Sequence, residues 1–185
     1  MIKLIQGDAT SPRPRLGQGV VIAHICNDVG GWGAGFVLAI SAVSSAPEAA
    51  YRALAKDHGA TRNSGKRIPR GQVQFVDCRI PDCDGHYIVA NMIAQNGLDR
   101  RAVPNGVLVD YVALEKCLDI VFARSAELGF EVHMPKGIGS GLAGGNAETI
   151  YGMIETAAKK FCVDVTLWEF IDSSAPPFVP KKRRG

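Results

Sequence analysis

The chain has 185 residues, a hydrophobic fraction of 46% and a mean hydropathy of +0.05, which are typical of one water-soluble globular domain. No apolar run approaches the roughly 20 residues that a membrane-spanning helix needs, and the apolar start at Met1–Ile5 is too short for a signal-peptide core. The formal charge is +3, but Lys181, Lys182, Arg183 and Arg184 contribute +4, which leaves −1 for the rest of the chain. A near-neutral body argues against a dedicated nucleic-acid surface. Because the N-terminus reads as a first strand and not as a signal peptide, we expect a cytoplasmic protein, and we expect it to be a monomer.

The five cysteines are an odd number and include no CxxC pair, which argues against a disulfide framework. Cys78, Cys83 and His86 lie close together in sequence, but their spacing matches none of the usual zinc patterns. We therefore predict no metal site.

Six apolar, β-branched runs predict strands, and several are apolar at consecutive positions, as in strands buried on both faces. These runs are Ile2–Ile5, Val20–Ile25, Val73–Val76, Tyr87–Ile93, Glu131–Met134 and Val163–Phe170.

Helical patterns alternate with these runs. Pro47 favours a helix start before Glu48–Lys56, apolar residues at helical spacing predict a helix over Val107–Leu128, and Asn146 is a candidate cap for a helix that continues through Lys160. A further helix is expected to begin near Phe36, and the segment 59–71 reads as an exposed loop. The alternation predicts a three-layer α/β/α sandwich around a mixed, mostly parallel sheet. We place the domain at residues 1–172 and expect a disordered basic tail over 173–185.

Two glycine-rich loops follow predicted strands. Asn27–Phe36 follows the strand that ends at Cys26, and Lys136–Gly145 follows the strand that ends at Met134. Glycine runs let backbone N–H groups approach phosphate oxygens, and helix starts add partial positive charge. Neither loop has the dinucleotide-binding or P-loop pattern. Two such loops after two strands predict a phosphate-containing ligand.

The ordered set of Gly7–Thr10, Asn27, Gly33–Gly35 and Ile138–Leu142 resembles the macrodomain family, and the resemblance runs from about Ile2 to Phe170. Within that family, His24–Asn27 and Met134–Lys136 are most similar to the branch that contains the terminal ADP-ribose glycohydrolases and their bacterial relatives. Members of this branch remove ADP-ribose from protein carboxylates or deacetylate O-acetyl-ADP-ribose.

The resemblance implies a role for each matching position. Asp8 would accept a hydrogen bond from the adenine amine, the Ala9 amide would donate to an adenine ring nitrogen, and Asn27 would bind the distal ribose. Phe170 would stack on adenine, although core filling is an equal alternative and Trp168 is a second candidate aromatic residue. The residues that would surround the distal ribose and diphosphate are Gly33, Ala34, Gly35, Phe36, Gly137, Ile138, Gly139, Ser140, Gly141 and Leu142.

Two family positions differ here. The branch uses a lysine nucleophile where this chain has Ala94-Gln95, and an aspartate where it has Ala143. A covalent lysine intermediate is therefore not expected. Asp28 and Asn27 are the candidate catalytic residues. Asp28 would orient or deprotonate water, with a capping role as the alternative. Trp32 is expected either to cover the distal ribose or to anchor its loop.

The sequence thus predicts an ADP-ribose-binding hydrolase without a cofactor or metal, whose partner is ADP-ribose or an ADP-ribosylated protein. The alternatives are an ADP-ribose-binding module without turnover and a phosphatase acting on ADP-ribose 1″-phosphate.

Overall fold

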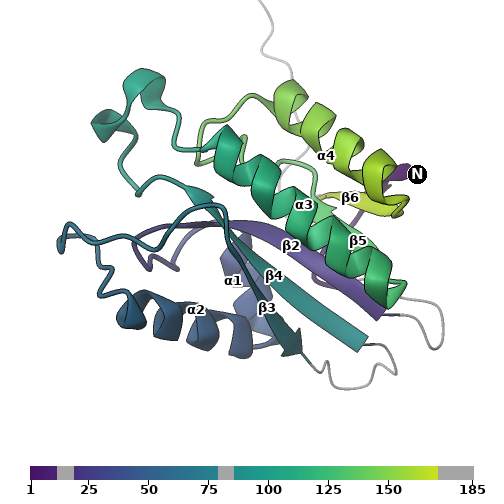
Figure 1. The fold of residues 1–185 in the computed structure, drawn as a ribbon, viewed down its shortest axis with the longest axis horizontal. Coiled ribbons are helices and arrows are strands. Elements are labelled where there is room, and N and C mark those ends of the chain that lie inside the picture. The colour runs from purple at the N-terminus through teal and green to yellow at the C-terminus, as the bar shows by residue number, and fades with distance from the viewer. Residues whose placement is uncertain (12–18, 79–85, 171–185) are drawn as a thin grey trace, which may run out of the picture.

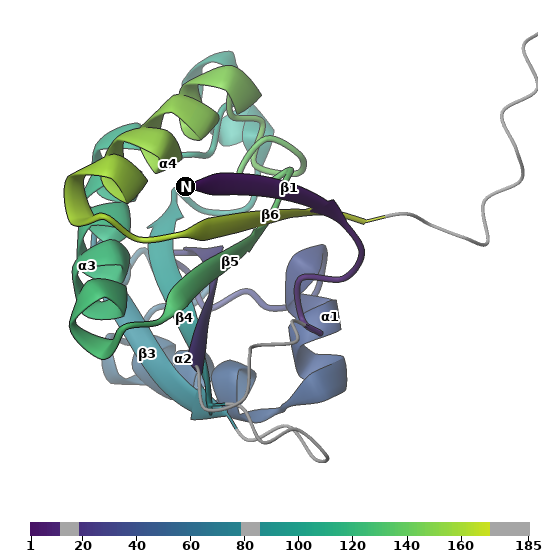
Figure 2. The same cartoon turned by 90° about the vertical axis from the view of Figure 1, so that its right-hand side faces the viewer.

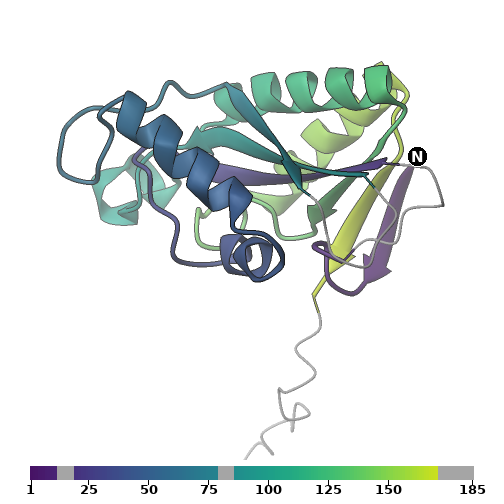
Figure 3. The ribbon, with the colours of Figure 1, turned by 90° about the horizontal axis from the view of Figure 1, so that it is seen from below.

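Six strands form one mixed sheet in the part of the chain that the computed structural model describes, residues 1–11, 19–78 and 86–170 (Figure 1). The strand order is β1-β6-β5-β2-β4-β3, and neighbouring strands are parallel except for the antiparallel pair β3–β4. The strands are β1 (Ile2–Gln6), β2 (Gly19–Asn27), β3 (Val73–Cys78), β4 (His86–Gln95), β5 (Glu131–Pro135) and β6 (Val165–Glu169). Figure 3 shows β1 and β6 side by side at one edge of the sheet.

Helices cover both faces of this sheet. In Figure 2, α3 and α4 lie together on one side, and α1 and α2 lie on the other. The helices are α1 (Phe36–Val43), α2 (Ala46–Asp57), α3 (Tyr111–Leu128) and α4 (Ala147–Phe161), with short 3-10 turns at Arg100–Ala102 and Pro104–Gly106. The predicted three-layer sandwich is therefore confirmed.

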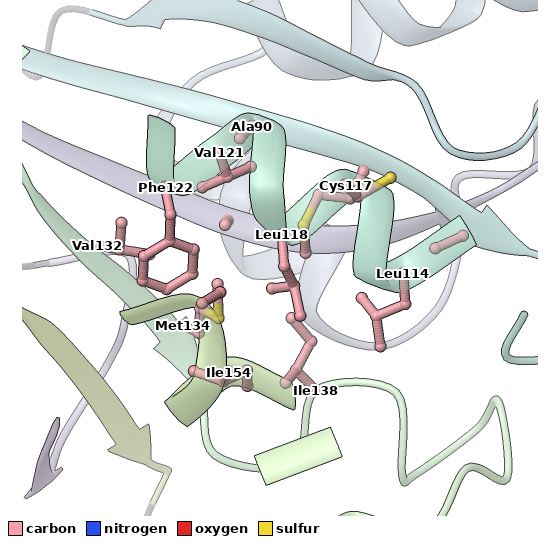
Figure 4. Close-up of a cluster of buried hydrophobic side chains, with 14 of the residues drawn as sticks. Ala90, Leu114, Cys117, Leu118, Val121, Phe122, Val132, Met134, Ile138 and Ile154 are labelled. Atoms are coloured by element: carbon pink, nitrogen blue, oxygen red, sulfur yellow. The ribbon is translucent and has the colours of Figure 1, made fainter. Parts of the chain in front are cut away.

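The larger core lies between the sheet and the α3–α4 layer (Figure 4). Leu114, Leu118 and Phe122 of α3 pack there with Met134 of β5. Ile138, which follows β5, inserts its side chain into the same core and is only 5% exposed. The loop after β5 is therefore fixed to the core by its own apolar side chain.

Helix caps decide where α3 and α4 begin. The Asn146 side chain accepts a hydrogen bond from Thr149 N at 2.8 Å, so the predicted cap of α4 is confirmed. The predicted start of α3 at Val107 is wrong, because Asp110 caps the helix by accepting a hydrogen bond from Ala113 N at 3.0 Å. Val109 before it is extended and forms a bridge with Gln95.

No helix among the described residues is both long enough and apolar enough to cross a membrane. Cys83 of the candidate metal group lies outside the described residues, as do the predicted domain boundary at residue 172 and the basic tail.

Candidate functional site

The two glycine-rich loops border one cavity of about 310 Å³. The first loop connects β2 to α1 and the second connects β5 to α4, and β2 and β5 are neighbours in the sheet. Both loops therefore lie at the carboxyl end of the sheet, where open α/β sheets bind their ligands. The cavity wall is formed by His24, Ile25, Ala34, Gly35, Phe36, Val37, Gln95, Pro135, Gly137, Ile138, Gly139, Gly141, Leu142 and Ala143.

Residues on both sides of this cavity have backbone N–H groups without an acceptor in the described part of the chain. On the first side they belong to Ala34, Gly35, Phe36 and Val37, of which the last two begin α1. On the second side they belong to Gly137, Gly139, Gly141, Leu142 and Ala143. Unpaired N–H groups and a helix start carry partial positive charge, and none of the described residues on the wall is a carboxylate. The cavity is therefore suited to an anion.

Glycine is required at two points of this wall. Gly35 has φ of +79° directly before α1, and Gly139 has φ of +72° in the second loop. A Cβ atom on Gly139 would lie 3.0 Å from the side chains of both Ile25 and Ile150. A larger residue at either position would strain the backbone, and at Gly139 it would also displace the loop from the core.

Asn27 organises the first loop from within. Its Oδ1 accepts hydrogen bonds from Val29 N at 3.1 Å and Gly31 N at 2.9 Å, and its Nδ2 donates to Gly31 O at 2.6 Å. Tyr51 Oη lies 3.0 Å from the same Oδ1 and 2.5 Å from the Asn27 carbonyl oxygen. Asn27 is 6% exposed and does not line the cavity, so its side chain holds the loop in shape.

Asp28 does not reach the cavity either. Its side chain is fully buried, Oδ2 accepts a hydrogen bond from Arg70 Nη1 at 2.6 Å, and Oδ1 accepts one from Gly97 N at 2.8 Å. Arg67 Nε lies 3.7 Å from Oδ1. Its position thus contradicts the expectation that Asp28 acts on water in the cavity, because both of its oxygens are fixed by donors on the other side of the loop.

His24 is a wall residue for which the sequence suggested no role. Burial lowers its pKa from 6.5 to about 4, against a smaller opposing effect of the hydrogen bond to Asn91, so the ring is neutral. His24 Nε2 donates to Asn91 Oδ1 at 2.6 Å. Trp32 packs edge-on against this ring with centroids 5.4 Å apart and donates from Nε1 to Ser41 Oγ at 2.8 Å. Trp32 is 6% exposed and off the wall, so it anchors the loop and does not cover a ligand.

Gln95 is the other polar side chain on the wall. The pairing of β2 with β4 shifts register between Cys26 and Asn27, which sets Gln95 opposite Asn27 at the end of β4. Such irregularities re-aim side chains at the ends of strands. Gln95 Nε2 donates to Gly97 O at 2.8 Å, while Oε1 has no partner among the described residues. A half-buried amide oxygen is therefore available to a ligand at the place where the resemblance expects a lysine.

The residues predicted to hold adenine lie at the edge of the sheet. Asp8 and Ala9 follow β1, and Phe170 follows the neighbouring strand β6. Asp8 Oδ1 accepts hydrogen bonds from the N and Oγ1 atoms of Thr10, both at 2.8 Å, which leaves Oδ2 without a partner in the described chain. Phe170 is 73% exposed, so the core-filling alternative is wrong. Trp168, the second candidate aromatic residue, donates a hydrogen bond from Nε1 to His133 Nδ1 at 3.0 Å.

The remaining predicted residues lie in the two loops without lining the cavity. A Cβ atom on Gly33 would meet nothing within 4 Å, and Ser140 Oγ donates to Gly137 O at 3.1 Å. Within residues 1–11, 19–78 and 86–170, no group of three or more His, Cys, Asp or Glu side chains is placed to hold a metal ion.

Comparison with solved structures identifies relatives over most of the chain. A protein of unknown function from Bacteroides thetaiotaomicron is 37% identical with a TM-score of 0.77, over 92% of this chain and 98% of that one. A macrodomain protein from Streptomyces coelicolor is 37% identical with a TM-score of 0.73, over 91% and 99%. Thermosipho africanus DarTG in complex with ADP-ribose is 12% identical with a TM-score of 0.67, over 95% and 43%. No family model matches the chain, and no curated protein matches it significantly.

Proposed function

The chain belongs to the macrodomain family, and from this membership we propose that its cavity binds ADP-ribose and that the protein hydrolyses ADP-ribose derivatives. The substrates would be protein carboxylates carrying mono-ADP-ribose, O-acetyl-ADP-ribose, or both. The observation that carries the proposal is the set of unpaired backbone N–H groups on both sides of one cavity.

The charge of a diphosphate is complementary to these groups. Gly35 and Phe36 offer N–H groups at the start of α1, while Gly139, Gly141 and Leu142 offer them from the facing loop. N–H groups at a helix start and in glycine-rich turns are the usual backbone ligands of phosphate. A cavity of about 310 Å³ is at the small end of ligand pockets, so it would hold the diphosphate and distal ribose. The adenosine would extend to the edge formed by β1 and β6.

At that edge, Asp8 Oδ2 would accept a hydrogen bond from the adenine amine, because Oδ1 is already occupied by Thr10. The exposed ring of Phe170 would stack on the base. A ligand lacking adenine would lose both contacts.

For the distal ribose, Gln95 is better placed than Asn27. The Asn27 oxygen already receives several donors within its own loop, whereas Gln95 Oε1 is unpaired on the cavity wall. We assign to Gln95 Oε1 a hydrogen bond from a hydroxyl of the distal ribose. Replacing Gln95 by methionine keeps the volume and removes the acceptor, so we expect about five- to tenfold weaker ADP-ribose binding and unchanged binding of ADP, which has no distal ribose.

Gln72→Met is the matched control for Gln95→Met. Gln72 is a half-buried glutamine whose Nε2 also donates to a backbone oxygen, that of Pro69, outside the cavity. If Gln95→Met weakened the binding of ADP and the binding of ADP-ribose equally, the role of Gln95 would be structural.

The chemistry available here is attack by water. Among the described residues, no lysine, cysteine or carboxylate lies on the cavity wall, and the His24 ring is held by the hydrogen bond from its Nε2 to Asn91. We therefore propose no covalent intermediate. Water would bond to the anomeric carbon, the bond from that carbon to the carboxylate oxygen would break, and a proton would be released with the free carboxylate. For O-acetyl-ADP-ribose, water would instead add to the acetyl carbonyl carbon, and the bond from that carbon to the ribose oxygen would break. The ribose oxygen would take one proton of the water to become a hydroxyl, and the acetyl group would be released as acetate with the other proton. The protein would contribute orientation and neutralisation of charge.

The same absence of lysine, cysteine and carboxylate side chains among the described wall residues favours a second candidate function, an ADP-ribose-binding module without turnover. One experiment separates the two. Glutamate-linked mono-ADP-ribosylated protein, O-acetyl-ADP-ribose and ADP-ribose 1″-phosphate are each incubated with the protein, alongside calorimetry with ADP-ribose. Turnover of either of the first two supports the hydrolase, affinity without turnover supports the module, and turnover of the third alone indicates a phosphatase. Absence of both affinity and turnover would contradict the proposal as a whole.

A further inference from the structure

Positive charge is concentrated beside the first loop. The segment 59–71 contains Arg62, Lys66, Arg67 and Arg70 and no acidic residue. The residues before Ser173 have a formal net charge of −1, to which this segment contributes +4. The rest of them therefore have a net charge of −5. Figure 1 shows this segment, between α2 and β3, and the segment between β4 and α3 both projecting at the end of the sheet where the first loop lies.

Both projecting segments are tied to the first loop. Ile68 is fully buried and its N–H donates to Asp28 O at 2.9 Å. The Asp28 carboxylate accepts hydrogen bonds from Arg70 in one segment and from Gly97 N in the other. Arg70 also pairs with Asp110 at 2.8 Å. These contacts preorganise the surface, which lowers the entropic cost of binding a partner.

The cations surround two hollows that share a residue. One hollow, of about 250 Å³, is lined by Val29 of the first loop, Leu98, Arg62 and Arg67 among others. The second, of about 380 Å³, is lined by Arg67, Arg70 and Lys116 together with Asp28 and Asp110. We call the four cations Arg62, Arg67, Arg70 and Lys116 the basic surface. Arg62 and Lys116 form no direct ion pair with any described residue, although Asp99 lines the same hollow as Arg62 and is close enough to be affected by its charge. Neither cation is therefore fixed to a carboxylate of the described chain.

We propose that the basic surface binds a carboxylate-rich polypeptide segment next to the residue that carries ADP-ribose. This inference rests on the proposed function, in which the distal ribose is bound by Gln95 at the end of β4. Val29 and Asp28 of the first loop line the two hollows, and Asn96, which lines the hollow of about 250 Å³, directly follows Gln95 of the cavity wall. A chain attached to a ribose bound at Gln95 would therefore leave the cavity beside these cations. Complementary charge would then select acidic stretches of protein and speed their association.

The composition of the surface favours a polypeptide over a nucleic acid. Residues 59–71 and 97–106 contain no Phe, Tyr or Trp, whereas proteins that bind single-stranded nucleic acids combine cations with stacked aromatic rings. Asp99 pairs with Arg101 and Asp110 with Arg70, which interrupts the row of positive charge that a phosphate backbone would follow.

The test measures binding of three probes to the full chain: a glutamate-rich peptide, the same peptide with glutamine in place of glutamate, and a single-stranded oligonucleotide of similar length. We expect the glutamate peptide to bind most tightly and its affinity to fall as salt is added. The double variant Arg62→Glu with Lys116→Glu reverses the charge of the two cations that form no ion pair. It should weaken the binding of the glutamate peptide at least about tenfold. The control, Lys159→Glu with Lys160→Glu, makes the same charge change at the far end of α4 and should have little effect.

Equal binding of the two peptides, tighter binding of the oligonucleotide, or an equal loss in both double variants would overturn the inference. Calorimetry with free ADP-ribose on the same samples tests the proposed function separately. If wild-type protein binds ADP-ribose but shows no preference for the glutamate peptide, only the inference fails.

Discussion

The two loops that border the cavity are held in place by different forces. The first depends on polar contacts: Asn27 bonds within the loop, and Asp28 joins it to Arg70 and Gly97. The second depends on packing, with Ile138 in the main core and Gly139 pressed between Ile25 and Ile150. Both present unpaired N–H groups to the same space. Similar binding surfaces can therefore be held by a polar support, the hydrogen bonds of the first loop, or by an apolar support, the core packing of the second. Substitutions in the polar support should break hydrogen bonds, and those in the apolar support should leave cavities.

The largest effect is expected from a negative charge on the second wall. A Cβ atom on Gly141 meets nothing within 4 Å, so Gly141→Glu should fold. Its carboxylate would stand among the N–H groups meant for the diphosphate, and like charges in a binding site cost several kcal/mol. We expect at least about a hundredfold loss of ADP-ribose affinity by calorimetry. Gly152→Glu on α4, whose Cβ is equally free, is the control and should bind normally. Retained affinity in Gly141→Glu would remove the second loop from the binding site.

The apolar support is tested by Ile138→Ala. This change leaves a cavity in a packed core and should lower the free energy of unfolding by about 3 kcal/mol. Denaturant titration measures the loss. A cost below about 1 kcal/mol would mean that the loop is not held by packing.

The polar support is tested by Asp28→Ala. Removing the carboxylate leaves Gly97 N without its acceptor and Arg70 with only Asp110. Because Arg70 is 31% exposed and keeps one partner, we expect a loss of about 2 kcal/mol, less than for a fully buried ion pair. Asp28→Asn should recover part of this, since its amide oxygen can still accept from Gly97. If Asp28→Ala instead abolished turnover while stability stayed unchanged, a role in chemistry would have to be restored.

Acid should destabilise the protein through His24. Its pKa is lowered to about 4 in the folded state, so the unfolded state binds more protons between that value and its own pKa of about 6.5. Stability therefore falls as the pH drops through this window, by about 2 kcal/mol between pH 7 and pH 5. Burial lowers the pKa of His133 in the same direction. His24→Gln should reduce the loss of unfolding free energy between pH 7 and pH 5 by the contribution of His24, while that of His133 remains. An unchanged slope of stability against pH would contradict the lowered pKa of His24.

The sequence predicted the features that depend on local pattern. The glycine runs after strands located both loops, and Asn146 located the start of α4. The sequence misplaced the start of α3, because Val107 and Val109 continue the helical spacing although Val109 pairs with Gln95. It also misjudged Asp28, whose partners Arg70 and Gly97 lie 42 and 69 residues away. Contacts at that separation leave no local signal, and the same holds for the register shift that directs Gln95 into the cavity.

The central claim is that backbone N–H groups of both loops bind one diphosphate. Amide chemical shifts of isotope-labelled protein, followed by NMR while ADP-ribose is added, test it directly. We predict the largest changes at Gly35, Phe36, Gly139, Gly141 and Leu142, and ADP should produce a closely similar pattern. Shifts confined to one loop, or to residues away from the cavity, would contradict the account.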